Sequence, residues 1–325
     1  MRKPSFVICL QKRQDLKGME KTKKLRSGYR SLPKGYYHLC TDGRGIGTLF
    51  HNSRQFAFIV NTLAIIAVKF DVVIYAYEIM PNHIHLLVSC TGNTCVDIFE
   101  YLCRRISKML KDSGYDDLPD NYCFRLVPIT TVASMRSHYV YIARNPYEKG
   151  FCMPCGYLWG SGYLAYNWLS GQIHGRKVSD YSVRELSREL NSKVQLPPDW
   201  EMHPVLGVLP QFFVNTKKFH EVFPNVKLWF TMLIKDYESC AHISDSLGEE
   251  MILSDVEAKD IVNGIVNKEF HKDSVNALSE TERYRIALKL STVYHMPTKT
   301  ISYYLNLSER VVIQSLKSKD YGTTV

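Results

Sequence analysis

The sequence lacks several features that identify common classes of protein. It contains no Gly-x-x-x-x-Gly-Lys-Ser/Thr loop, the motif that cradles nucleotide phosphates in P-loop enzymes. The only apolar run near its start, residues 6–10, is too short for a signal peptide or a membrane span. No internal repeat or low-complexity tract is visible. These absences argue against a P-loop nucleotide hydrolase, a membrane protein and a repeat protein.

Cysteine usage also excludes a disulfide scaffold. The nine cysteines are scattered and odd in number, and they form no paired framework, which suits a reducing cytosol. Cys152-Met153-Pro154-Cys155 is a lone Cys-x-x-Cys pair, whereas a zinc ribbon needs a second such pair. We therefore interpret this motif as structural.

Acidic residues are scarce in the first 35 residues, which contain 11 Lys and Arg but only Asp15 and Glu20. The resulting net charge of +9 equals the formal charge of the whole chain. A basic arm of this kind is expected to contact phosphates and to bind DNA in a salt-sensitive way. A merely solubilising tail is the alternative. The candidate DNA contacts in the arm are Lys12, Arg13, Lys23, Lys24 and Arg26.

The tripeptide His83-Ile84-His85 is a candidate metal site. It follows the apolar segment 72–77 and the turn residues 80–82, so it is expected to open the second strand of a hairpin. In a strand, side chains alternate between the two faces, so His83 and His85 project to one side. Two imidazoles about 7 Å apart on one face can share a divalent cation. A core or surface role without a metal is the alternative.

A helix is expected over residues 135–144, with Ser134 as its N-cap and Pro146 limiting its end. Tyr141 and Asn145 are four residues apart and therefore share one face of this helix. The amide oxygen of Asn145 is a suitable third metal ligand, and the phenol of Tyr141 is a candidate nucleophile toward phosphorus. The alternatives are a packing role for Tyr141, one of 21 tyrosines, and a plain helix-terminal role for Asn145.

Together these two motifs resemble those of the single-tyrosine HUH transposases, and most closely the branch of REP-associated tyrosine transposases. The matching segments are Met80-Pro81-Asn82-His83-Ile84-His85-Leu86-Leu87-Val88 and Tyr141-Ile142-x-x-Asn145-Pro146. Insertion-sequence relatives typically have glutamine at the position of Asn145, which favours the REP-associated branch. The segment 157–163 is similar to a Trp-Ser-Ser-Tyr element of that branch, but it has Gly160 and Gly162 around Ser161.

The resemblance implies a metal-dependent endonuclease and strand transferase that acts on single-stranded, hairpin-forming DNA. His83, His85 and Asn145 would hold Mg²⁺ or Mn²⁺, and Tyr141 would attack the scissile phosphate to give a 5′-phosphotyrosine link and a 3′-OH. No nucleotide cofactor is needed, because the covalent intermediate keeps the energy of the phosphodiester. Arg144 and Lys149 are candidate sources of the positive charge that would favour the phenolate.

The family fold is α+β, a ferredoxin-like antiparallel sheet with helices, and the periodicity of this chain agrees with it. The expected strands are 36–40, 72–79, 83–90 and 123–129, and the expected helices are 54–70, 96–111 and 135–144. An all-α C-terminal region follows. The expected domains are a basic arm at 1–35, an HUH nuclease core at 36–166, a helical linking region at 167–270 and a helix-turn-helix-like DNA-binding unit at 271–325.

The C-terminal region is expected to hold several capped helices. Ser254-Asp255-Val256-Glu257 opens one helix, and the capping box Ser279-Glu280-Thr281-Glu282 opens another that runs to about Tyr294. A short helix starting at Pro297 and a third helix capped by Ser308 complete the shape of a helix-turn-helix unit. A plain helical packing module is the alternative.

Two further groups of side chains are candidate DNA contacts. On the 96–111 helix these are Arg104, Arg105 and Lys108, with an ordinary solvated helix face as the alternative. On the last helix they are Arg310, Gln314 and Lys317, while Val311, Val312 and Leu316 would pack inward or along its edge.

Three hypotheses follow. The first is a transposase that nicks and rejoins single-stranded DNA, and the second is the same chemistry in a relaxase or replication initiator. The third is a non-catalytic DNA-binding regulator derived from a transposase. DNA is the expected partner, a homodimer is an open alternative to a monomer, and no membrane is involved. The expected location is the bacterial cytoplasm, in association with the nucleoid.

Overall fold

The computed structural model of the protein describes residues 7–9, 28–43, 46–119, 122–153, 155–166, 171–249, 251 and 253–317. The chain forms two compact units. The first comprises Met1–Ile234 together with Ser246–Glu249, and the second comprises Lys235–Asp245 and Glu250–Val325. Residues up to 234 therefore pack with the first unit, whereas the sequence prediction grouped 167–270 as one linking region.

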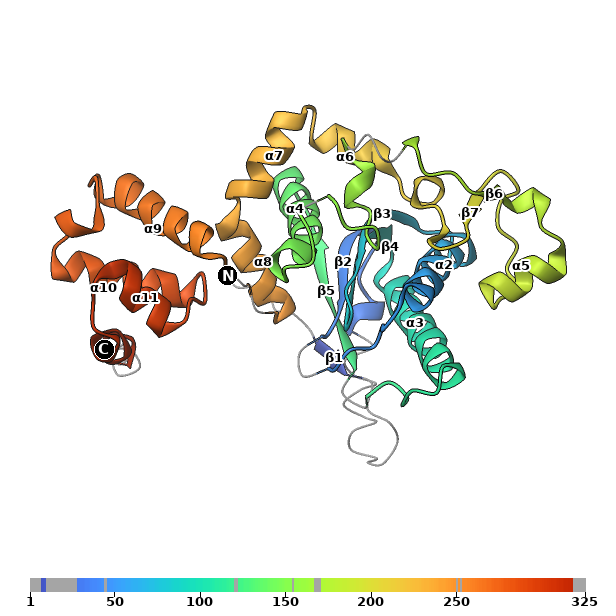
Figure 1. The fold of residues 1–325 in the computed structure, drawn as a ribbon, viewed down its shortest axis with the longest axis horizontal. Helices are drawn as coiled ribbons and strands as arrows, with labels where there is room; N and C mark the ends of the chain where they lie inside the picture. Colours follow the sequence, from blue (N-terminus) through green and yellow to red (C-terminus); the bar gives the residue numbers. More distant parts are fainter. Residues whose placement is uncertain are drawn as a thin grey trace. The chain divides into compact units, whose positions relative to one another are not determined.

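A five-stranded antiparallel sheet forms the centre of the first unit (Figure 1). The strands are β1 (Val7–Cys9), β2 (Gly35–Thr41), β3 (Val73–Ile79), β4 (Ile84–Cys90) and β5 (Cys123–Ile129). Their order across the sheet is β1-β5-β2-β4-β3. Strand β4 pairs with β2 on one side and β3 on the other, so the strand that follows the histidine pair is internal.

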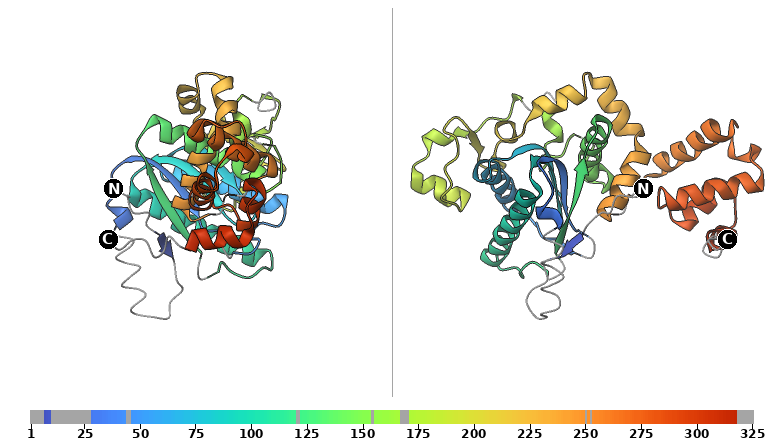
Figure 2. Two further views of the ribbon diagram at one scale, coloured as in Figure 1. Left: turned by 90° about the vertical axis from the view of Figure 1, so that its left-hand side faces the viewer. Right: turned by 180° about the vertical axis from the view of Figure 1, so that it is seen from behind.

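Helices cover both faces of this sheet. They are α2 (Ser53–Lys69), α3 (Gly92–Asp112) and α4 (Val132–Glu148). Figure 1 shows α2 and α3 on one side of the sheet and α4 on the other, and the view from behind in Figure 2 shows the same layers. The chain order is β2-α2-β3-β4-α3-β5-α4. The predicted α+β class, with an antiparallel sheet and several helices, is confirmed.

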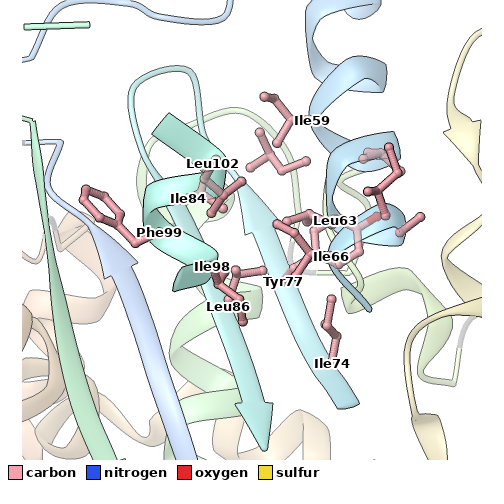
Figure 3. Close-up of a cluster of buried hydrophobic side chains, with 14 of the residues drawn as sticks. Ile59, Leu63, Ile66, Ile74, Tyr77, Ile84, Leu86, Ile98, Phe99 and Leu102 are labelled. Atoms are coloured by element: carbon pink, nitrogen blue, oxygen red, sulfur yellow. The ribbon is translucent and has the colours of Figure 1, made fainter. Parts of the chain in front are cut away.

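The main hydrophobic core lies between the sheet and the α2 and α3 layer (Figure 3). Ile59, Leu63 and Ile66 recur at helical spacing on α2 and form one wall of this core. The opposite wall includes Ile84 and Leu86 of β4. Because side chains alternate along a strand, the neighbours of these two residues on β4 point toward α4 instead.

The free edge of β3 is covered by two segments from later in the chain. The backbone N–H of Ile79 donates to Trp159 O at 3.0 Å, and the N–H of Ser161 donates to Tyr77 O at 2.9 Å. Further along the edge, the N–H of Asn215 donates to Ile74 O at 2.8 Å. These bonds pair backbone groups that would otherwise attract another strand. The segment similar to Trp-Ser-Ser-Tyr thus lies at the edge of the sheet.

Strand β1 was not predicted, because residues 1–35 were assigned to a basic arm. Its three residues pair with β5 and extend the sheet at the edge opposite β3. Among its described residues, the first unit also contains η1 (Gly162–Leu164), β6 (Arg176–Lys177), η3 (Val178–Asp180), α5 (Val183–Leu190), β7 (Glu201–His203), β8 (Gly207–Val208), η4 (Pro210–Phe212) and α6 (Thr216–Val222). Strands β6, β7 and β8 form a small separate sheet.

Two helices cross the division between the units, α7 (Val226–Lys235) and α8 (Tyr237–Leu247). The second unit then contains α9 (Asp255–Phe270), η5 (Val275–Ala277), α10 (Glu280–Thr292), α11 (Thr298–Leu305) and α12 (Glu309–Lys317). The predicted capping box of Ser279 with Glu282 is present, and Ser254, which was predicted to open a helix, forms a second capping box with Glu257. Helices α10, α11 and α12 pack on one another around buried residues that include Leu290, Ile301 and Val312.

None of the helices in the described part of the chain has both the length and the apolar character needed to cross a lipid bilayer.

Candidate functional site

The histidine pair lies on the α4 side of the sheet. His85 is on β4 and fully buried, and His83, just before the strand, is 5% exposed. Their Nε2 atoms are 3.0 Å apart. The ring centroids are 4.8 Å apart, and the Nε2 atoms of both rings face a common position.

The other nitrogen of each ring is held by a neighbouring side chain. His83 Nδ1 lies 2.7 Å from Asn82 Oδ1, which cannot donate, so His83 carries its proton on Nδ1 and leaves Nε2 as an acceptor. The amide of Asn82 donates in turn to Gly43 O at 3.0 Å. A Cβ at Gly43 would lie 2.8 Å from His83 Nδ1, so the loop can approach the ring closely because it has glycine there. His85 Nδ1 lies 3.1 Å from His38 Nε2.

A row of buried histidines continues behind His85. His38 is on β2, and its Nδ1 lies 2.8 Å from Nδ1 of His138 on α4. Burial lowers the pKa of His38 well below its ordinary value and lowers that of His138 to about 3, so both rings are neutral near pH 7. If His85 carries its proton on Nδ1, His38 accepts it at Nε2 and donates from Nδ1 to His138. One arrangement of protons then satisfies the row and leaves His85 Nε2 unprotonated.

Helix α4 brings Tyr141 and Asn145 to the same place. The helix begins at Val132, three residues earlier than predicted, because Thr131 and not Ser134 is the N-cap; its side chain accepts a hydrogen bond from Ser134 N at 3.0 Å. It also continues past Pro146 to Glu148, so the prediction that Pro146 limits the helix is wrong. This proline lies in the last turn of the helix, so the N–H that it lacks removes only one hydrogen bond near the helix end.

Asn145 is 4% exposed and its side-chain amide faces the histidine pair. Asn145 Nδ2 lies 3.0 Å from His85 Nε2, and Asn145 Oδ1 is buried with no hydrogen-bond partner among the described residues. The two ends of an amide are nearly the same size, so a half-turn of the group places Oδ1 beside His85 Nε2. A cation at this position would give that oxygen the partner it lacks.

Tyr141 is the tyrosine of α4 that reaches the site. Its ring centroid is 5.7 Å from that of His85, and its hydroxyl donates to Glu249 Oε2. Burial, and then the negative charge of Glu249, raise the pKa of Tyr141 well above its ordinary value. Tyr139, two residues earlier, instead packs edge-on against Phe219 at 5.4 Å. The structure thus brings together the four predicted residues His83, His85, Tyr141 and Asn145.

The sequence analysis missed Glu249, which lies 108 residues after Tyr141. Its Oε1 atom is 3.2 Å from His83 Nε2 and 3.7 Å from His85 Nε2, and it accepts a hydrogen bond from the thiol of Cys40 at 3.5 Å. The carboxylate is mostly buried, with a side chain 13% exposed. The only local signal was the glycine that precedes Glu249. A glycine after a helix indicates that the helix ends there, but it does not indicate that the next residue is a ligand.

Gly248 explains how the carboxylate is positioned. It follows the last residue of α8 with φ +68°, the left-handed conformation that ends many helices. A Cβ at this position would also lie 2.0 Å from Nη1 of Arg125, a residue of β5. The chain therefore turns tightly and passes close to the sheet, and the next side chain enters the site.

The donor set fits a divalent cation. The imidazole nitrogens of the histidine pair suit transition-metal ions, and the amide oxygen of Asn145 and the carboxylate oxygen of Glu249 suit Mg²⁺ and Mn²⁺. A separate group of donors, Cys40, His85 and Glu249, also has ligand atoms within 4.8 Å of one another. Since Glu249 and His85 belong to both descriptions, the two groups describe one site.

The predicted DNA-contacting residues have several outcomes. Lys12, Arg13, Lys23, Lys24 and Arg26 lie outside the described residues, as does the side chain of Lys317. The side chains of Arg104 and Lys108 on α3 are exposed, as are those of Arg310 and Gln314 on α12.

The prediction is wrong for Arg105, which is 7% exposed. Its guanidinium donates to the carbonyl oxygens of Leu190, at 2.7 Å, and Asn191, at 2.5 Å. The group also lies 4.4 Å from the ring centroid of Phe58. Arg105 therefore satisfies backbone acceptors at the end of α5, because a long cationic side chain on a helix can serve as a cap for another helix.

Comparisons of the chain with known protein families, with curated proteins and with solved structures found no match. The function must therefore be inferred from the motifs and from the geometry of the site.

Proposed function

We propose that this protein is a metal-dependent single-strand DNA endonuclease and strand transferase, a transposase of the single-tyrosine HUH type with a ferredoxin-like core. One observation carries the proposal. The Nε2 atoms of His83 and His85 lie 3.0 Å apart, both rings are held by Nδ1, and a buried phenol is linked to the same position through Glu249. Two imidazole acceptors facing each other at that distance repel unless a proton or a cation lies between them.

His83, His85 and Asn145 would hold Mg²⁺ or Mn²⁺. When bound there, the ion polarises the scissile phosphate and neutralises the charge that develops on it. Asn82 and His38 lie against the Nδ1 atoms of the two imidazoles, which would leave both Nε2 atoms available to hold the ion. The Asn145 amide contributes its oxygen after the half-turn described above.

Tyr141 is the nucleophile. Its Oη forms a bond to phosphorus, the bond from phosphorus to the 3′ oxygen breaks, and the phosphate stays attached to the 5′ carbon of the downstream strand. The phenol proton passes to the Glu249 carboxylate that already accepts its hydrogen bond, and the departing 3′ oxygen takes a proton from solvent water and leaves as a hydroxyl. One phosphodiester replaces another, so the reverse attack by a second 3′-OH reseals a strand without ATP.

DNA binding would be shared between the units. The exposed side chains Arg310 and Gln314 of α12 are available to contact DNA, in the manner of the last helix of a helix-turn-helix unit. The basic residues of the N-terminal 35 add phosphate contacts that are independent of sequence. Single-stranded DNA with a hairpin is the proposed substrate.

A covalent-adduct assay tests the proposal. Hairpin-forming oligonucleotides taken from palindromes that flank the gene are labelled at the 3′ end and incubated with protein and Mn²⁺. The wild type is expected to give a labelled band of protein mass on a denaturing gel, and Tyr141→Phe none. Tyr139→Phe is the matched control, because its buried hydroxyl has no hydrogen-bond partner among the described residues, and it should retain the adduct.

Two results would contradict this proposal. An adduct of equal yield in Tyr141→Phe would assign the nucleophile elsewhere. No adduct with any hairpin in the wild type, despite DNA binding, would favour the non-catalytic regulator.

A further inference from the structure

Glu249 has a position that the three-ligand description does not use. Its Oε1 atom lies 3.2 Å from His83 Nε2 and 3.7 Å from His85 Nε2. In the tautomers in which His83 donates from Nδ1 to Asn82 and His85 donates from Nδ1 to His38, neither Nε2 atom carries a proton. A carboxylate beside two acceptor nitrogens is unfavourable, since none of the three atoms can donate to the others.

The burial of the group makes the arrangement more costly. The side chain is 13% exposed, and it accepts hydrogen bonds that include those from the Cys40 thiol and the Tyr141 hydroxyl. An ionised carboxylate removed from water needs a cation or strong donors to offset its desolvation.

From this arrangement we infer that Glu249 is a fourth donor to the proposed metal ion, through Oε1. The inference rests on the proposed function, because it needs the cation at His83 and His85. It adds one negative charge to a set of three neutral ligands, and a charged oxygen ligand favours hard cations such as Mg²⁺ and Mn²⁺. The remaining oxygen, Oε2, stays directed at the phenol of Tyr141.

Glu249 lies at a point along the chain where the first unit gives way to the second. The chain leaves the first unit after Ile234 and rejoins it at Ser246–Glu249 before entering the second unit again. The fourth ligand is thus carried on the segment that joins the proposed nuclease to the helical unit. One chain supplies all four donors and the nucleophile, so the site is complete within a monomer.

Calorimetric titration of the metal-free protein with Mn²⁺ tests the inference. Glu249→Gln should bind Mn²⁺ about tenfold or more weakly than the wild type, since loss of even an outer-shell partner typically costs 10-fold to 100-fold. Glu221→Gln is the matched control, because Glu221 is an exposed carboxylate of the same unit, paired with Lys218, and its variant should bind as the wild type does. His83→Ala should remove binding altogether.

The variants test the proposed metal site and the role of Glu249 separately. If His83→Ala loses Mn²⁺ and Glu249→Gln binds as tightly as the wild type, Glu249 is not a ligand and the inference is overturned while the proposed site stands. If His83→Ala binds Mn²⁺ like the wild type, the proposed metal site is itself wrong.

A second pair of variants keeps the test decisive if Glu249→Gln does not fold. Gly248→Ala retains the carboxylate but places a Cβ against Arg125 at a left-handed φ, so it should displace Glu249 and weaken Mn²⁺ binding. Gly264→Ala, in the interior of α9 with nothing near its Cβ position, is the control and should leave binding unchanged. Equal affinities in these two variants would also overturn the inference.

Discussion

The two faces of strand β4 differ in chemical character. On one face Ile84 and Leu86 enter the apolar core beneath α2 and α3 (Figure 3). On the other, His85 lies among His38, Asn145 and Glu249, all buried or nearly so. One strand therefore contributes both to stability and to the candidate chemistry, and a shift of register by one residue would exchange the two roles.

The largest expected effect is a difference between substitutions on the two faces of β4. His85→Ala should lower metal-dependent nicking by about 10³-fold or more, because the ion accounts for several kcal/mol of transition-state stabilisation and each 1.36 kcal/mol is tenfold in rate. Leu86→Ala, on the opposite face, should lower the free energy of unfolding by about 2–5 kcal/mol. Activity assays and denaturant unfolding of both variants measure the contrast. Equal loss of stability in both, with activity following stability, would remove the distinction between the faces.

The next effect concerns the histidines behind the site. His38→Phe leaves the Nδ1–H of His85 without an acceptor, so Mn²⁺ affinity should fall about 10-fold to 100-fold. His138→Phe, one step further from the metal, should have a smaller effect. Calorimetry compares the two variants, and an unchanged affinity in His38→Phe would show that this row does not orient His85.

A fall in pH should lower the stability of the native state mainly through the buried histidines on the α4 side of the sheet. The pKa of His138 falls from its ordinary value of 6.5 to about 3 on burial, so the unfolded chain binds this proton more readily than the native protein does. The native state should therefore lose stability as pH falls from about 6.5 toward 3, and be unaffected by this group above 6.5. Unfolding midpoints from pH 7 to 4 should fall less steeply in His138→Leu. Parallel curves would mean that His138 does not contribute.

The smallest expected effect lies in the second unit. Arg310→Ala on α12 should weaken DNA binding by about 1–3 kcal/mol if the side chain reads a base, and by less if it contacts only phosphate. Lys259→Ala, on the exposed surface of α9, is the control from the same unit. Binding titrations at several salt concentrations distinguish the two kinds of contact, because only loss of a phosphate contact reduces the salt slope by about one.

Local patterns in the sequence predicted much of this structure. Alternating and helical periodicities located β2 to β5 and α2 to α4 of the first unit, and N-terminal capping signals located α9 and α10. The His-x-His spacing and the four-residue interval from Tyr141 to Asn145 also named four side chains that the fold brings together.

Partners set by long-range packing were not predictable from such patterns. His38 lies 47 residues from His85, and Glu249 lies 108 residues from Tyr141, so neither pairing leaves a periodic signal. The burial of Arg105 was missed for the same reason, because its carbonyl partners at the end of α5 are 85 and 86 residues away. Arginine on a helix looks the same in sequence whether it meets solvent or another helix end.

The most direct test of the central claim is an anomalous-scattering map from a crystal of the protein soaked in Mn²⁺. The account predicts one strong peak bonded to Nε2 of both His83 and His85, with the side chains of Asn145 and Glu249 also in contact. A map without a peak at these nitrogens, in a crystal that holds Mn²⁺ elsewhere, would contradict it.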